Sequence, residues 1–199
     1  MSTLRAGSDA SSSISVAPGR RAGTTALLVT AAVGGAVSVA VGVYAKQHDP
    51  TNEQILHVGF PSTLSMKAWL TTGVFALAIA QGVSASWMWG RLPRAGSPPG
   101  WVRHAHRWTG TAAFLLSLPV AYHCLWSLGW RSTDARVVLH GVLGCAFFGA
   151  LTTKLLLLRI DGAPKWVLPL AGGLLVAILT AIWLTSSLWF FTNVGFPGL

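Results

Sequence analysis

Residues 166–190 read WVLPLAGGLLVAILTAIWLTSSLWF, an apolar run that no charged side chain interrupts. The hydrocarbon core of a bilayer is about 30 Å thick, and a helix needs about 20 apolar residues to cross it. This run therefore predicts a transmembrane helix. Four further stretches have the same character, and together they predict an all-α integral membrane helical bundle. We place its five transmembrane helices at Thr24–Tyr44, Lys67–Gly90, His106–Leu128, Arg136–Leu158 and Trp166–Phe190.

The composition agrees with a chain whose main solvent is lipid. Of its 199 residues, 52% are hydrophobic and 10% are charged, whereas soluble domains carry about 25% charged residues. The net charge of +9 does not indicate a nucleic-acid partner, because the basic residues stand in short clusters between long uncharged runs, as in membrane loops. We expect a multi-pass protein of the inner (plasma) membrane whose partner is the lipid bilayer.

Lys and Arg residues favour one side of the predicted bundle. The side that holds the N-terminus carries Arg5, Arg20, Arg21, Arg91, Arg94, Arg103, Arg107, Lys154, Arg159 and Lys165, and the other carries Lys46, Lys67, Arg131 and Arg136. Because cytoplasmic loops are enriched in basic residues, this asymmetry predicts N-inside and C-outside. Residues 1–23 are then a disordered cytoplasmic tail, 24–191 the five-helix transmembrane domain and 192–199 a short external tail.

Small residues recur at every fourth position in three of the predicted helices. The sets are Gly34, Ser38 and Gly42; Gly141, Cys145 and Gly149; and Gly173, Ala177 and Ala181. Apolar lipid gives helices no hydrophobic reason to associate, so contacts between them depend on close backbone approach at small residues. These stripes predict helix packing and carry no functional information.

Two histidines fall at the same predicted depth. His123 lies about five residues from the outer end of the third span, and His140 lies four residues after Arg136, at the outer start of the fourth. At 1.5 Å per residue, both lie roughly 6–8 Å below the outer interface on antiparallel neighbours. Neutral imidazoles are axial ligands of haem iron, so His123 and His140 are candidate metal ligands.

The surroundings of this pair suit a porphyrin. Arg136 lies one turn outward from His140, where its guanidinium could receive a propionate. Gly144, one turn deeper, leaves room for a flat ring, and Phe147 and Phe148 could pack beside it. The alternative interpretation is that the two histidines are hydrogen-bonded to backbone carbonyls, or to each other through water.

Three other polar groups enter the predicted spans. His106 belongs to an isolated His-x-His pattern, a weak metal signal, and at an interface such a residue is ordinarily solvated or bound to lipid headgroups. Lys154 is near enough to a helix end to extend its ammonium to the interface. Gln81 is too deep to do so and is expected to hydrogen-bond across a helix contact, with a place on a proton path as the alternative.

Three segments resemble a family of small, mostly actinobacterial membrane proteins of unknown function. They are FPSTLSMKAWL at 60–70, HRWTGTAAFLLSLPVAYHCLW at 106–126 and LHGVLGCAFFGALTTKLLLLR at 139–159. The resemblance covers about residues 45–191. It implies a multi-helix membrane protein and leaves the activity open.

A more distant likeness is to transmembrane b-type cytochromes that oxidise ascorbate or reduce ferric iron. The elements His106-Arg107-Trp108-Thr109-Gly110 and His140-Gly141-Val142-Leu143-Gly144 match the HR-x-x-G and H-x-x-L-G patterns around haem ligands in those proteins. The resemblance implies His106 and His140 as cofactor ligands, with His123 as a third. Those cytochromes usually hold two haems on four histidines, whereas this chain has three histidines in its predicted spans.

These observations lead to a functional hypothesis with an alternative. The chain is expected to be a membrane electron-transfer protein, or a membrane-anchor subunit of an oxidoreductase, with haem b between His123 and His140 near the outer face. Its redox partners would be an extracytoplasmic protein or a quinone, in an oligomer or hetero-complex, and whether it is an enzyme stays open. The alternative is a structural or assembly subunit with no cofactor. Proton-coupled transport through Gln81, Lys154 and His140 is less favoured because the spans hold no carboxylate.

Overall fold

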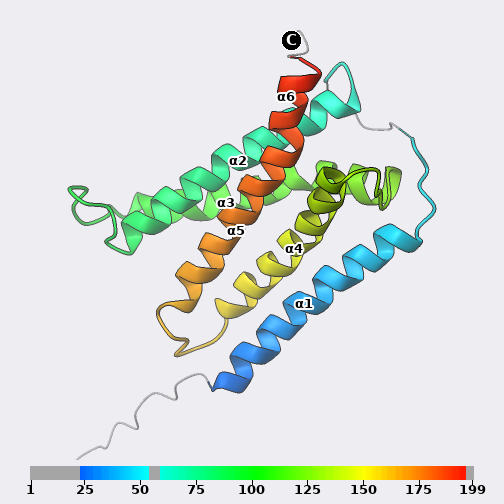
Figure 1. Ribbon diagram of the computed structural model, residues 1–199. Helices are drawn as coiled ribbons and strands as arrows, with labels where there is room; N and C mark the ends of the chain where they lie inside the picture. The colour runs from blue at the N-terminus through cyan, green and yellow to red at the C-terminus, as the bar shows by residue number, and fades with distance from the viewer. Residues whose placement is uncertain (1–22, 54–58, 196–199) are drawn as a thin grey trace, which may run out of the picture.

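The computed structural model describes residues 23–53 and 59–195, which fold into helices and connecting loops only (Figure 1). Its α-helices are α1 (Thr24–Gln47), α2 (Thr63–Met88), α3 (Trp101–Tyr122), α4 (Ala135–Leu157), α5 (Val167–Trp183) and α6 (Trp189–Asn193). A π-helical turn, η1 (His123–Ser127), continues α3, and a second, η2 (Leu184–Leu188), joins α5 to α6. Within the described residues the chain therefore forms five long helical segments, which confirms the predicted all-α class.

Four of the five segments are long and apolar enough to cross a membrane: Thr24–Gln47, Thr63–Met88, Ala135–Leu157 and Val167–Asn193. The third predicted span is not among them, because His104, His106 and Arg107 lower the hydropathy of the first turns of α3. Even so, α3 packs extensively against α2. The chain is a multi-pass membrane protein with four candidate spans. The crossing by α3 and the N-inside, C-outside orientation stay predictions.

Polar capping residues explain why two helices begin where they do. The Ser62 hydroxyl accepts a hydrogen bond from the Ser65 amide (3.1 Å) at the start of α2, and an Asp134 carboxylate oxygen accepts one from the Val137 amide (3.0 Å) at the start of α4. Such caps satisfy amides that lack a partner within the helix. Hydropathy alone placed the second start at Lys67, four residues after the actual start at Thr63.

Glycines bring α1 and α4 into backbone contact. A Cβ atom on Gly34 would lie 2.6 Å from the carbonyl oxygen of Gly149, and one on Gly149 would meet Gly34 and Ser38. These contacts confirm two of the predicted small-residue stripes. The third predicted stripe is wrong at Gly173, because a Cβ atom added there would meet nothing within 4 Å. Elsewhere, α4 and α5 pack through a core of Phe147, Leu175 and Ile178.

The loops at one end of the bundle are tied to η1. The Asn52 amide donates to the Ser127 carbonyl (2.9 Å), the Ser127 hydroxyl donates to the Glu53 carbonyl (2.7 Å), and the Trp130 amide donates to the Ala45 carbonyl (2.7 Å). All but one residue of the predicted N-terminal tail, 1–22, and half of the predicted C-terminal tail, 196–199, lie outside the described residues. The last helix continues to Asn193, two residues past the predicted domain end at 191.

Candidate cofactor site

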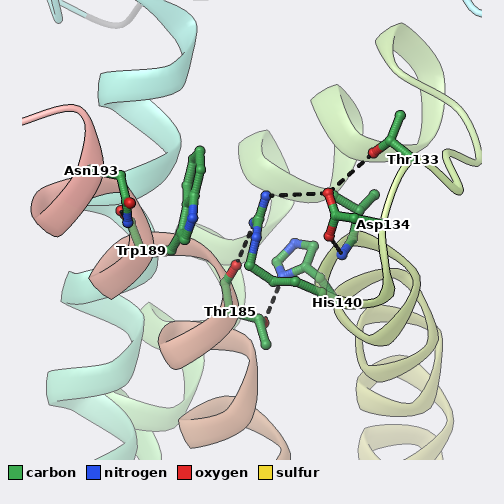
Figure 2. A network of polar contacts seen from close by, with 8 residues as sticks. Thr133, Asp134, His140, Thr185, Trp189 and Asn193 are labelled. Carbon is green, nitrogen blue, oxygen red and sulfur yellow. Dashed lines mark hydrogen bonds and ion pairs between the residues drawn. The ribbon is translucent and has the colours of Figure 1, made fainter.

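His140 is held by the neighbouring helix at the π-helical turn η2. Its Nδ1 atom lies 3.2 Å from the Thr185 hydroxyl oxygen, which itself donates to the Ala181 carbonyl at 2.8 Å (Figure 2). Because the hydroxyl proton is engaged in that bond, we assign the imidazole Nδ1–H as the donor to Thr185. The other ring nitrogen, Nε2, is then the acceptor in the neutral imidazole. That tautomer leaves Nε2 available as a metal ligand.

Arg136 spans the gap between α4 and the last helical segment. Its Nη1 donates to the Thr185 carbonyl (2.9 Å), its Nη2 lies 3.9 Å from an Asp134 carboxylate oxygen, and its guanidinium carbon lies 4.0 Å from the centre of a Trp189 ring. Figure 2 shows Asp134 and His140 on one side of this gap and Thr185 and Trp189 on the other. Arg136 thus fastens the end of α4 to η2, a role that sequence reasoning did not foresee.

A cavity of about 190 Å³ lies beside His140. We call it the histidine cavity. Its walls come from α1, α2, α3, η1, α4, α5 and the loop after η1, and they are almost entirely apolar, with Trp130, Gly144, Phe147 and Phe148 among them. A Cβ atom on Gly144 would meet nothing within 4 Å, so the predicted open space at this glycine is confirmed. Arg131 also lines the cavity, and its Nη2 donates to Asn52 Oδ1 at 2.6 Å.

His123, the predicted partner of His140, does not line the histidine cavity. It is 1% exposed and begins the π-helical turn η1, although the next residue along, Cys124, does face the cavity. The structure therefore brings one of the two predicted ligands to the cavity, and ligation of one haem by both histidines stays a prediction. Among the described residues, no group of three or more His, Cys, Asp or Glu side chains is placed to hold a metal ion.

His106 belongs to a separate polar cluster between α2 and α3. Its Nδ1 lies 2.8 Å from the Ser84 hydroxyl oxygen, and its backbone carbonyl accepts a hydrogen bond from the Gln81 amide. His106 and His123 are 17 positions apart along α3 and η1, which corresponds to roughly 25 Å of helix. The structure thus does not bring His106 to the histidine cavity. The predicted bond of Gln81 across a helix contact is confirmed, since it also reaches Thr109 Oγ1 at 2.6 Å.

Thr185 is the residue of this site that sequence reasoning missed. The only signal was a cluster of hydroxyls, Thr185, Ser186 and Ser187, in an otherwise apolar run. Ser187 is fully buried and donates to the Ala68 carbonyl of α2 at 3.0 Å. Polar residues in a membrane span commonly mark contacts with neighbouring helices, and Thr185 and Ser187 do so.

The chain belongs to DUF6529, a family of unknown function, which it matches over residues 26–198. This confirms the resemblance to a family of unknown function that the sequence indicated. No curated protein matches the chain, and no solved structure does.

Proposed function

We propose that this DUF6529 protein is a membrane electron-transfer protein, or a membrane-anchor subunit of an oxidoreductase, that binds haem b at the histidine cavity. The observation that carries the proposal is the placement of His140. Its Nδ1 is engaged by Thr185 while its side chain lines an apolar cavity, and such a partner orients a metal-binding imidazole. When bound, haem supplies one-electron exchange.

The other cavity residues have roles in the same proposal. The apolar walls exclude water and favour a porphyrin over solvent, and Gly144 leaves space beside His140. Arg131, which lines the cavity, would exchange its contact with Asn52 Oδ1 for a propionate. Arg136 was the predicted propionate partner, but its guanidinium is already engaged by η2, Asp134 and Trp189, so we assign it to positioning Thr185.

The size of the cavity adds a specific requirement. Sites for whole cofactors usually measure about 300–1,000 Å³, whereas the histidine cavity measures about 190 Å³. Haem binding must therefore displace a wall. Trp130 is a bulky candidate, because it lines the cavity from a loop and lies 3.2 Å from the Cβ position of Gly141.

The state of the iron distinguishes two versions of the proposal. If His140 alone held the haem, the buried His123 would stay where it is. If both histidines held it, η1 would have to turn His123 into the cavity. Visible spectra of the purified, detergent-solubilised full chain, oxidised and reduced, separate these versions. A protein that holds no haem after expression with ample haem supply would contradict both.

A structural or assembly subunit without a cofactor is the second candidate, and one observation favours it. The polar groups at this end already have protein partners: His140 has Thr185, and Arg136 has Thr185, Asp134 and Trp189. These contacts account for His140 as a link between α4 and η2. This candidate predicts that His140→Ala lowers the thermal stability of a protein that contains no iron.

A further inference from the structure

A second cavity, of about 80 Å³, lies between α2, α3, α4 and α5. We call it the lysine cavity. Phe147 and Leu179 line both cavities and separate them. Most of the lysine cavity is apolar, but two polar side chains from different helices, Gln81 of α2 and Lys154 of α4, also line it.

The side-chain carbonyl oxygen of Gln81 is available as a hydrogen-bond acceptor. Its amide nitrogen donates to the His106 carbonyl and to Thr109 Oγ1, whose own proton is engaged with the Ala105 carbonyl at 2.8 Å. Because both partners act as acceptors, the orientation of the amide is fixed. No described residue donates to Gln81 Oε1, which lies 3.2 Å from the Cβ position of Gly110 at the cavity wall.

Lys154 brings a cation without a counter-ion to the same space. Within the described residues the one ion pair is Arg136–Asp134, and no acceptor lies within hydrogen-bond distance of the Lys154 ammonium. An unpaired cation in apolar surroundings is costly. The side chain lines the cavity, and the extension of its ammonium to the interface stays a prediction.

We infer that the lysine cavity binds a small monoanion, a halide or a carboxylate head group, on the Lys154 ammonium. Gln81 Oε1 accepts a hydrogen bond from the accompanying water. The volume of about 80 Å³ equals roughly two to three water molecules in the liquid, which suits a small anionic group with water. This inference is independent of the haem proposal, because it uses neither His123 nor His140.

The test measures thermal unfolding of the detergent-solubilised full chain at constant ionic strength. Sulfate is the starting anion, and bromide or hexanoate is titrated in as the probe. We expect a saturable rise in the unfolding midpoint for the wild type and for Lys165→Met, a control at an exposed basic residue in the loop after α4. Lys154→Met should weaken the apparent affinity about 10- to 100-fold, because a hydrogen bond to a charged group is lost.

The two probes identify the source of the anion. Competition between bromide and hexanoate means that the site accepts any small monoanion, whereas binding of hexanoate alone identifies a lipid-like carboxylate. No saturable binding of either probe overturns the inference, as does equal weakening in Lys154→Met and Lys165→Met. If Lys154→Met does not fold, anomalous scattering from bromide-soaked crystals of the wild type decides. Bromide beside Lys154 supports the proposed site, and bromide found only at other positions overturns the inference.

Discussion

Replacing Gly34 with alanine should separate α1 from α4. The added Cβ atom would lie 2.6 Å from the Gly149 carbonyl oxygen and would also collide with the Thr153 hydroxyl. A backbone carbonyl in a helix cannot rotate away, so the helices must move apart. Overpacking of this kind costs about 1–3 kcal/mol, while exchanging glycine for alanine inside a helix returns about 1 kcal/mol of helix propensity.

Gly35→Ala is the matched control, because Gly35 is exposed on the same helix and its added Cβ atom would meet nothing within 4 Å. The propensity gain is common to both variants, so their difference isolates the packing cost of about 1–3 kcal/mol. For a chain of this size that corresponds to about 2–12 °C in unfolding midpoint, measured by far-ultraviolet circular dichroism in detergent. Equal midpoints for the two variants would refute the predicted contact between α1 and α4.

Three further predictions follow from the caps, the orientation and the site. Thr185→Val removes the acceptor of the His140 Nδ1–H and should weaken haem binding about 10- to 100-fold in a haem titration, whereas Thr185→Ser should restore it; equal affinities in all three proteins would contradict the orienting role. The hydrogen bond from the Val137 amide, with the nearby charge of Arg136, lowers the pKa of Asp134 in the folded protein. The stabilisation that the ionised carboxylate gives the fold is therefore present above the unfolded pKa of about 3.9, and it is lost as the pH falls through the lower pKa of the folded protein. The midpoint difference between the wild type and Asp134→Ala should therefore shrink on acidification through this window, and a constant difference would exclude the carboxylate as its source. A C-terminal fusion to a reporter that is active only outside the cytoplasm should be active, and an inactive but expressed fusion would reverse the predicted orientation.

The helices were predictable from the sequence because their apolar runs are long. The first residues of the helices were harder to predict, since capping residues such as Ser62 and Asp134 are polar and fall outside an apolar run. The third helix shows the difference most clearly: it begins at Trp101, five residues before the predicted start, because its first turn carries basic residues. Hydropathy locates lipid-facing segments, while helix formation depends on backbone hydrogen bonding.

The sequence predicted a depth for the candidate site but could not give the direction of its side chains. Counting residues from the helix ends placed His123 and His140 at one level, but it could not say which way each side chain points. His123 begins a π-helical turn, where the angle between successive residues departs from that of an α-helix. Thr185 could not be paired with His140 from sequence, because that contact depends on how α4 packs against η2.

The most direct test of the proposed function is the ratio of haem to protein after purification, measured as the pyridine haemochrome in the wild type, His140→Ala and His104→Ala. His104 is an exposed histidine of α3 and serves as the control. The proposal predicts about one haem per chain in the wild type and in His104→Ala, and a loss of haem in folded His140→Ala. Absence of haem from the wild type, or full retention in His140→Ala, would contradict the assignment of His140 as the haem ligand.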